Sequence, residues 1–459
     1  MTFIPNIEEF KELAEDYNVI AVRTEFTTDA ETPLSAYAKL SGSKPAFLFE
    51  SVVGGEQVSR YSFVGSSPYK TISSDSNITK VTDDKGEAKV RKSFRGGEGI
   101  RWDKGERGVI VGLKEFGIEV HQNIGKTGLV GIIHGKNSDS NKAIGIRADI
   151  DALPMSEKTN LPYASKNEGA MHACGHDGHA TMLLGAAKYL AQTRNFNGTV
   201  HCIFQPAEEG GNAGAKAMIK DGLFKRFNIE SIWGIHNWPG VSVGQAVIHE
   251  GFAMAGGDII VLNIHGKGGH AAQPQHSNDP IVAAGLTITA LQSLVSRQLD
   301  PFNNVALSLT KIEGGSAFNV IPDGVTIGGT LRSTDKMLRD ETLAKIKNIA
   351  ENACAINNCT VDLEIRPGYP STINDKKSAQ LASSIFEKTY GKNSINRVEK
   401  PTMTSEDFSY MLEEKPGAYI WLGAGENSEK LHSPHFDFND ELLPIGAQFW
   451  KNLVHQVLN

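Results

Sequence analysis

The sequence contains no long apolar run and no surplus of basic residues, and both absences exclude classes of protein. No stretch approaches the ~18 consecutive apolar residues of a membrane-spanning helix, so we expect no membrane span. The formal net charge is −7, and a chain with this acidic balance has no electrostatic footprint for nucleic acid. It also has no basic run that could hold an anionic membrane surface. We therefore expect partners other than nucleic acids and membranes.

Cysteine is scarce, and its positions form neither a CxxC pair nor a dense disulfide framework. The cysteines are Cys174, Cys202, Cys354 and Cys359. Such spacing suits a reducing cytosol. Residues 1–18 are acidic and amphipathic, without the basic and apolar regions of a signal peptide. These features together predict a cytoplasmic protein.

The length of the chain and the changes in its pattern of apolar residues predict several domains. A chain of 459 residues is too long for one ordinary core, so two or three domains are expected. Residues 1–92 have a helical spacing at Ile7, Phe10, Leu13 and Ala14, followed by short strand-like runs between turn signals. Residues 93–107 are glycine-rich and charged without a clear period, which is typical of a junction.

Two further patterns follow the junction. In residues 108–256 and 369–459, apolar strands alternate with helices, which predicts an α/β layered sheet. Residues 257–368 have the order β-α-β-β-α-β, which is the ferredoxin-like unit. This order predicts a separate small domain inserted into the larger one.

The densest cluster of reactive side chains lies at 171–181, in the sequence MHACGHDGHAT. It contains Cys174 and His176, together with His172, Asp177 and His179. Thiolate and imidazole are good ligands for zinc and similar divalent ions. The spacing of this cluster alone also fits a single structural site, so it does not decide the chemistry.

Four more groups follow predicted strands. They are the pair Asp149 and Asp151, the pair Glu208 and Glu209, then His236, and finally His432. Each one alone is more often structural or solvated than a ligand. Because ligands bind at the carboxyl edge of open α/β sheets, their shared position predicts that they converge there with Cys174 and His176. We therefore expect one metal centre.

At this point the motifs show a family resemblance. The segments RADIDALPM, HACGHDGHATMLLGAAKYL, FQPAEEGG, GIHNWP, GKGGHAAQP, GGSAFNVIPD, SEDF and LHSPHF resemble the M20 metallopeptidase superfamily. Within it they are similar to the amidohydrolase branch of hippurate hydrolases, N-acetyl-amino-acid deacetylases and indole-acetyl-amino-acid hydrolases. The resemblance covers residues 108–459 and implies a zinc-peptidase-like layered α/β catalytic domain.

The resemblance also implies roles for single residues. Two divalent ions (Mn, Zn, Co or Ni) are expected on Cys174, His176, Glu209, His236 and His432. Glu208 is expected to be the general base, and Asp149 and Asp151 are expected to support the ligands. His270, in the inserted domain, is expected to reach the active site of a neighbouring subunit in a homodimer formed through residues 257–368. Asn319 and Arg332 are candidates for binding the substrate, with a structural role for both about equally plausible.

These roles fit a hydrolysis of N-acyl amino acids, with N-acetyl, N-benzoyl or similar acyl groups. Two divalent ions lower the pKa of a bridging water and give hydroxide near neutral pH. Glu208 then takes a proton from it and passes a proton to the leaving amine. His270 is expected to donate to the oxyanion of the tetrahedral intermediate.

Residues 1–92 differ from this pattern. The segment that includes FLFESV and RYSFVG resembles the N-terminal region of anthranilate synthase component I. In that family the segment contributes to tryptophan binding, and Glu50, Ser51 and Arg60 match it. The part that would carry chorismate chemistry is absent, so we expect neither that activity nor a tryptophan site. In the M20-like part, the usual first-helix motif is replaced by RGGEGIRWDKGERG, so a fusion is expected to have overwritten the first helix.

The sequence leaves three alternatives to the amidohydrolase open. One is a dipeptidase of the same superfamily. Another is a regulatory protein in which the front module senses an aromatic amino acid. The third is a fusion product without activity.

Overall fold

The computed structural model describes residues 105–137 and 140–459, with side chains from Gly108 onward, and in the first 104 residues it describes seven strands only. These strands are β1 (Phe3–Ile4), β2 (Arg23–Thr24), β3 (Ala46–Glu50), β4 (Ser62–Ser66), β5 (Lys70–Ser74), β6 (Ile78–Asp83) and β7 (Ala88–Lys92). The chain separates into two compact units, Met1–Gly97 and Glu98–Asn459. In the first unit, β1 pairs with β2, β3 pairs with β4, and β5, β6 and β7 form an antiparallel sheet. The expected helix around Ile7–Ala14, the side chains of Glu50, Ser51 and Arg60, and residues 93–104 of the expected junction lie outside the described residues.

The second unit is built on a seven-stranded sheet with the order β13-β22-β12-β10-β11-β9-β8. Its strands are β8 (Glu119–Ile124), β9 (Gly128–His134), β10 (Ala143–Asp149), β11 (Thr199–Gln205), β12 (Ser231–Pro239), β13 (Ala246–Val247) and β22 (Gly417–Gly425). The four strands β11, β10, β12 and β22 are parallel, and Asp149 pairs with Gln205 at their carboxyl ends. Every residue of β10 is buried, as expected for a strand covered on both faces.

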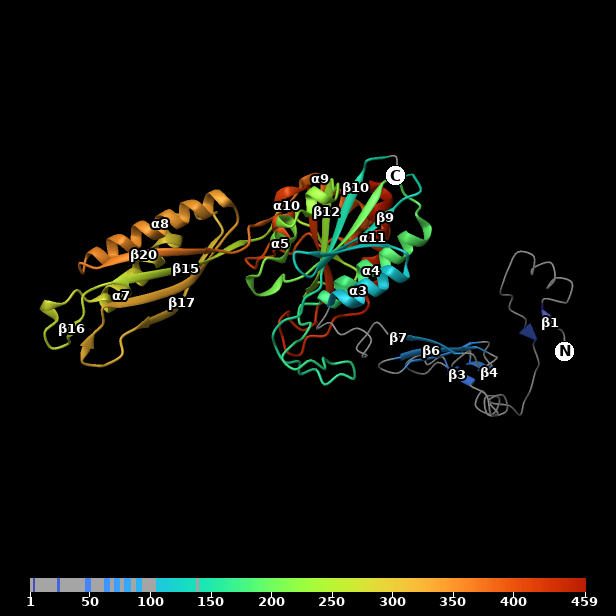
Figure 1. The fold of residues 1–459 in the computed structure, drawn as a ribbon, viewed down its shortest axis with the longest axis horizontal. Helices are drawn as coiled ribbons and strands as arrows, with labels where there is room; N and C mark the ends of the chain where they lie inside the picture. Colours follow the sequence, from blue (N-terminus) through green and yellow to red (C-terminus); the bar gives the residue numbers. More distant parts are fainter. Residues whose placement is uncertain are drawn as a thin grey trace. The chain divides into compact units, whose positions relative to one another are not determined.

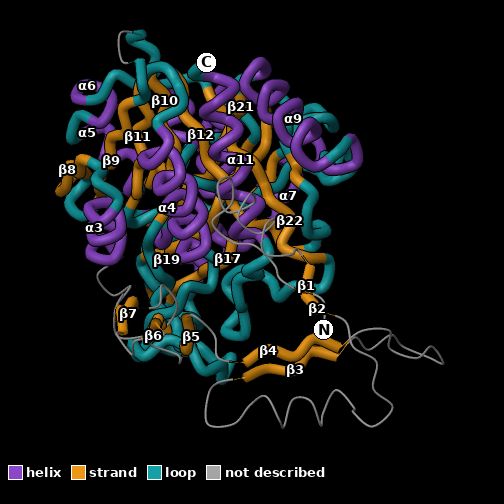
Figure 2. Tube along the Cα trace, turned by 90° about the vertical axis from the view of Figure 1, so that its right-hand side faces the viewer, coloured by secondary structure: helices purple, strands orange, loops and turns teal. Residues whose placement is uncertain are grey.

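Helices cover both faces of this sheet. The helices on the two faces are α3 (Gly105–Glu115), α4 (His176–Thr193), α9 (Lys376–Tyr390) and α11 (Leu442–Val457) on one side, and α5 (Gly214–Lys220), α6 (Leu223–Arg226) and α10 (Ser409–Glu414) on the other. Figure 2 shows α4 and α11 side by side along the central strands, and the two helices contact each other. The larger core forms beneath them, and a second core lies beneath α5, α6 and α10.

Helix α3 is the first helix that the structure describes in this part of the chain. It begins at Gly105, inside the expected junction, and ends at Glu115. Val109 and Leu113 lie one turn apart, are fully buried and pack into the larger core. Two apolar residues at helical spacing therefore anchor α3 in the larger core.

A second, four-stranded antiparallel sheet has the order β17-β19-β15-β20. Its elements follow the chain as β15 (Gly256–His265), α7 (Pro280–Ser293), β17 (Val305–Gly314), β19 (Gly324–Ser333), α8 (Lys336–Ala355) and β20 (Thr360–Pro367). The side chains of Asp279 and Asp335 accept hydrogen bonds from backbone amides at the starts of α7 and α8, which fixes where these helices begin. Helices α7 and α8 contact each other and lie along the sheet, and the sheet and the two helices share a core of their own (Figure 1).

Short elements complete the described part of the chain. They are β14 (Gly251–Met254), β16 (Gly269–His270), β18 (Val320–Ile321), β21 (Thr372–Asn374) and the single turns η2 (Glu209–Gly211), η3 (Pro274–His276), η4 (Leu294–Gln298) and η5 (Lys392–Ser394). Strand β14 pairs with β21, and β16 pairs with β18. No helix among the described residues is both long enough and apolar enough to cross a membrane.

Candidate metal centre

The carboxyl edge of the seven-stranded sheet receives polar side chains from five separate places in the chain. Asp149 ends β10, Glu208 follows β11, and His236 lies near the end of β12. Cys174 and His176 stand at the start of α4, and His432 follows β22. Parallel strands end at one edge, and this topology brings distant sequence segments together there.

The start of α4 depends on a glycine. Gly175, between Cys174 and His176, has φ +90 in the left-handed region, where side chains are strained. A Cβ atom at this position would lie 2.2 Å from Asn237 Oδ1. The chain can therefore pass this close to β12 only with glycine, and the close approach places both flanking ligand candidates against the end of that strand.

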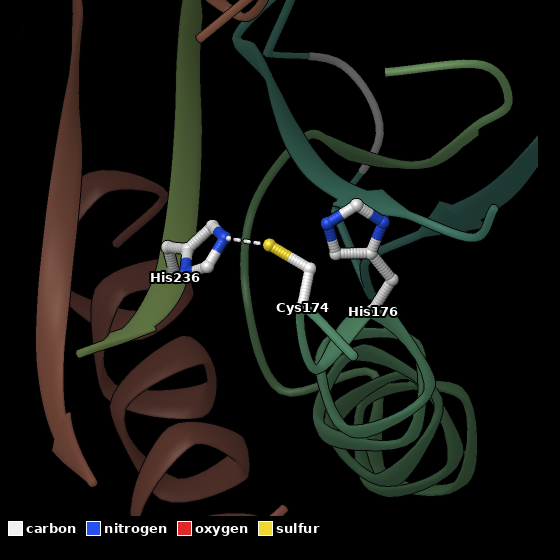
Figure 3. A group of neighbouring side chains, drawn as sticks. All are labelled: Cys174, His176 and His236. Carbon is white, nitrogen blue, oxygen red and sulfur yellow. Dashed lines mark hydrogen bonds between the residues drawn. The ribbon is translucent and has the colours of Figure 1, made fainter. Parts of the chain in front are cut away.

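Cys174, His176 and His236 converge on one point, which Figure 3 shows in close-up. Cys174 Sγ lies 3.3 Å from His236 Nε2. His236 Nδ1 lies 2.7 Å from the carbonyl oxygen of Asn237, so this nitrogen carries the proton and Nε2 is left with its lone pair toward the thiol. All three side chains are buried.

Glu209 and His432 extend this point into a second group. His432 Nε2 lies 3.2 Å from Glu209 Oε1. The backbone N–H of His432 donates to the carbonyl oxygen of Ala173, so the two ligand-bearing loops are tied together beside Cys174. His432 itself has φ +63, which is uncommon for a residue with a side chain and often marks a functional site.

The donor atoms fit a pair of divalent ions. Two groups of three side chains, Cys174–His176–His236 and Cys174–Glu209–His432, each have ligand atoms within 4.8 Å of one another, and they share Cys174. His176 Nε2 is buried and makes no hydrogen bond to any described residue, so a polar atom faces the cluster without a hydrogen-bonding partner. One thiolate, one carboxylate and three imidazoles favour zinc, manganese, cobalt or nickel over magnesium.

Burial and neighbouring charge shape the protonation of these groups. Burial raises the pKa of Cys174 to about 12 and lowers the pKa of His236 well below its ordinary value. Burial also acts to lower the pKa of His176, but Asp149 and Cys174 outweigh it, and the net pKa is raised. The negative charge that raises the pKa of this buried histidine also favours a metal cation, which can take the place of the proton.

Glu208 lies beside this cluster, with its side chain almost fully buried. Burial raises its pKa well above the ordinary value, and the nearby carboxylates Glu406 and Asp407 raise it further. Oxygen atoms of all three carboxyl groups lie within 4.8 Å of one another. A glutamate with a raised pKa is suited to accept and hold a proton near neutral pH.

A buried arginine organises the carboxylates behind the cluster. Arg147 donates to Asp149 at 2.7 Å, to Glu406 at 2.8 Å and to Gln205 at 2.8 Å. Burial would raise the pKa of Asp149, but Arg147 and His176 outweigh it, so the pKa lies well below its usual range. Burial raises the pKa of Asp407, which Arg147 opposes, to about 7.

The two supporting aspartates contact different histidines. Asp149 Oδ1 lies 2.6 Å from Nδ1 of His179, a ring whose other nitrogen contacts Asn237. Asp151 Oδ1 lies 3.2 Å from His176 Nδ1, and this contact orients Nε2 toward the cluster. The sequence singled out both aspartates, but it assigned no role to His179 or Arg147. The neighbouring aspartates in RADID were the available signal for Arg147, because a buried carboxylate needs a cationic partner.

Three expected residues do not join these groups. His270 is exposed in β16, and its Nδ1 accepts a hydrogen bond from the Ala272 amide. The backbone oxygen of Asn319 accepts a hydrogen bond from Ala271. Arg332 donates to the hydroxyl of Ser405, next to Glu406. Within the described chain these side chains therefore lie outside the metal-ligand groups.

Comparison with known proteins supplies an independent observation. The sequence profile described as peptidase family M20/M25/M40 matches residues 145–456. A hippurate hydrolase from Campylobacter jejuni is 44% identical over 346 residues, which cover 75% of this chain and 89% of that protein. An N-acetylcysteine deacetylase from Bacillus subtilis is 39% identical over 334 residues, which cover 72% of this chain and 86% of that protein. The crystal structure of the Bacillus subtilis YXEP protein, a dinuclear metal binding peptidase from the M20 family, aligns with a TM-score of 0.68 and 33% identity, covering 78% of this chain and 96% of that one.

Proposed function

Because this chain belongs to peptidase family M20/M25/M40, we propose that it hydrolyses the amide bond of N-acylated amino acids with the help of two divalent metal ions. One observation carries the proposal: two donor groups meet at Cys174, and Glu208 stands beside them. The names of the relatives point to N-benzoyl and N-acetyl amino acids as the substrate class.

The ions would be held by Cys174, His176, Glu209, His236 and His432, with Cys174 common to both donor groups. When bound, two such ions lower the pKa of a water molecule and polarise the amide carbonyl. Glu208 accepts a proton from the attacking water and delivers it to the nitrogen of the leaving amino acid. Its burial and the neighbouring carboxylates support this role, since both raise its pKa.

The segment 257–368, which we propose is an inserted domain, would supply further parts of the site. We assign residues 108–256 and 369–459 to the catalytic domain, with α3 as its first helix, and residues 257–368 to a ferredoxin-like domain that forms a homodimer. His270 would reach the neighbouring subunit's active site and donate to the oxyanion, and Asn319 and Arg332 would hold the substrate's carboxylate or carbonyl. Support comes from the exposure of His270, whose Nδ1 is already engaged and whose Nε2 is the remaining donor.

The first 92 residues are proposed to derive from the N-terminal region of anthranilate synthase component I. The pairing of β3 with β4 joins the two segments that carry the resemblance. Calorimetry with tryptophan at millimolar concentration is expected to show no heat, and measurable binding would assign this segment a sensing role.

A cytoplasmic location is supported by the four cysteines, which are free thiols.

The proposed function is tested by an activity panel with metal content measured on the same sample. N-acetyl and N-benzoyl amino acids should be hydrolysed, and dipeptides should be poorer substrates. Dialysis against a chelator should remove the activity, and manganese, cobalt or zinc should restore it. Full activity of metal-free protein would refute the mechanism, and a preference for dipeptides would instead identify a dipeptidase of the same family.

A further inference from the structure

The loop that carries Glu208 and Glu209 has a strained backbone. It connects β11 to α5, and Gly214 N–H donates to the Ala207 carbonyl oxygen to close it. Ala207 and Ala213 have φ +54 and φ +52, in the left-handed region that residues with a side chain seldom adopt. A Cβ at Gly214 would lie 1.6 Å from the Pro206 carbonyl oxygen, so the ends of the loop touch. Such a conformation persists only where surrounding contacts impose it.

Those contacts hold the peptide group that joins Glu208 to Glu209. Its carbonyl oxygen, on Glu208, accepts a hydrogen bond from the Tyr369 hydroxyl. Its N–H, on Glu209, donates to Asp151 Oδ2 at 2.9 Å. Side chains from two distant segments therefore hold both polar atoms of one peptide group. Because ψ of Glu208 and φ of Glu209 set the angle between the two side chains, holding this peptide group fixes the two carboxylates relative to each other.

The chemistry of Tyr369 suits a permanent donor. Burial raises the pKa of its phenol, and the charges of Glu208 and Asp407 raise it further, against the opposing effect of the Ala213 backbone amide. The hydroxyl thus keeps its proton throughout the neutral range and can donate to the Glu208 carbonyl. The backbone of Tyr369 is also fixed, because its carbonyl oxygen accepts from Gly257 N–H at 3.0 Å.

We propose that Tyr369 is a positioning residue, which fixes the Glu208–Glu209 peptide so that one carboxylate faces the water and the other faces the metal ions. The inference rests on the proposed function, in which Glu208 is the base and Glu209 is a ligand. Tyr369 follows β20, the last strand of the inserted sheet, so the chain orients its catalytic loop from the point where it returns to the larger sheet.

Tyr369→Phe tests the proposal because it removes one oxygen atom and keeps the ring. Tyr410→Phe is the matched control: its ring lies 6.3 Å from that of Tyr369, and its hydroxyl donates to a backbone carbonyl too, at Gly368. For each variant, kcat and KM are measured on an N-acyl amino acid, Mn²⁺ affinity is measured by titrating metal-free protein, and the unfolding midpoint is recorded.

Tyr369→Phe should lower kcat about tenfold with KM almost unchanged, and should weaken Mn²⁺ binding to the metal-free protein. Tyr410→Phe should leave kcat, KM and Mn²⁺ affinity as they are. Wild-type kcat and metal affinity in Tyr369→Phe would overturn the proposal. Equal losses in both variants, in step with their unfolding midpoints, would also overturn it and reduce Tyr369 to a structural role. Glu208→Gln distinguishes a failure of this proposal from a failure of the proposed function. An active Glu208→Gln variant would refute the proposed function itself, in which Glu208 is the base.

Discussion

At the scale of single residues, buried charges depend on each other. Arg147 is fully buried and contacts Asp149, Glu406 and Asp407, so one cation faces three carboxylates. Removing one member of such a network leaves an uncompensated charge inside the protein, which costs about 3–5 kcal/mol. The excess of negative charge lies behind the proposed ligands, and it favours a cation at their position.

A buried histidine away from the metal centre predicts acid sensitivity. His201, on β11, is buried next to the Phe227 ring, with its ring centroid 5.5 Å away. Burial lowers its pKa to about 4, with His134 and His121 adding to the effect against a backbone hydrogen bond at Ile144. Because an unfolded chain binds this proton near pH 6.5, stability is present above that pH and is lost as pH falls from 6.5 through 4.

His201→Gln should remove this contribution, which is on the order of 3 kcal/mol at its limit. Urea unfolding at pH 7.5 and pH 5 measures it: the loss of unfolding free energy on acidification should be smaller in the variant than in wild type. His276→Gln, on the exposed turn η3, serves as the control for a neutralised histidine. An identical pH dependence in His201→Gln and wild type would contradict the assignment.

The limits of sequence reasoning at this scale are physical. Metal chemistry restricts the residue types, and the strands predict one shared edge, so the sequence could place the proposed ligands together. They are Cys174, His176, Glu209, His236 and His432, and the choice of these five among their neighbours came from the family resemblance. Tyr369 and His179 act through hydrogen bonds to backbone or to other side chains, and many residue types can make such bonds. Their roles become visible only when distant segments are seen in contact.

At the scale of elements, the start of α4 shows how backbone geometry sets side-chain chemistry. The helix begins without a side-chain cap, and Gly175 turns the chain in a left-handed conformation. The side chain that it approaches, Asn237, is fully buried and contacts the ring of His179 through Oδ1 at 2.7 Å. Any shift of Asn237 therefore displaces His179 and the residues around it.

Gly175→Ala should destabilise the protein by about 2 kcal/mol or more and weaken metal binding, because backbone strain and a steric clash act together. Gly222→Ala is a matched control. Gly222 also precedes a helix in the left-handed region, at φ +92, but a Cβ there meets only ordinary contacts from 3.6 Å outward. In Gly222→Ala, chemical unfolding should show only the loss of stability caused by backbone strain, and the metal content should equal that of wild type. If both variants bind metal equally well, the close approach at Gly175 has no role in the site.

The longer elements could be anticipated from the sequence, and the shorter ones could not. Strand β22 is a continuous apolar run, β10 is apolar up to Arg147, and α11 carries its apolar residues on one face. Helices α5, α6 and α10 have seven residues or fewer, which is too short for a period to emerge. Helix α3 begins at Gly105, inside the glycine-rich, charged segment, whereas the two buried residues that anchor it, Val109 and Leu113, lie just beyond that segment.

At the scale of the whole molecule, the proposed dimer makes each active site depend on two chains. His270→Ala and Glu208→Gln should each be inactive as pure proteins. Mixed and refolded together, they should regain about one quarter of wild-type activity, because half of the dimers are mixed and each mixed dimer has one complete site. Activity assays and sedimentation of the same mixture measure this. A fully active His270→Ala, or a wild-type chain that is active as a monomer, would exclude a role across subunits.

The described residues form three separate cores, and the third belongs to one unit alone, the segment 257–368. This unit begins and ends at neighbouring points, since Asp258 on β15 pairs with Pro367 on β20, and Gly368 N–H donates to the Gly257 carbonyl oxygen. An ancestral gene could thus have gained the whole unit in one event, between two adjacent points on the surface of a smaller enzyme. The same arrangement offers protein engineers an exchangeable cassette, since a short turn can replace about a hundred residues without drawing the rest of the chain apart.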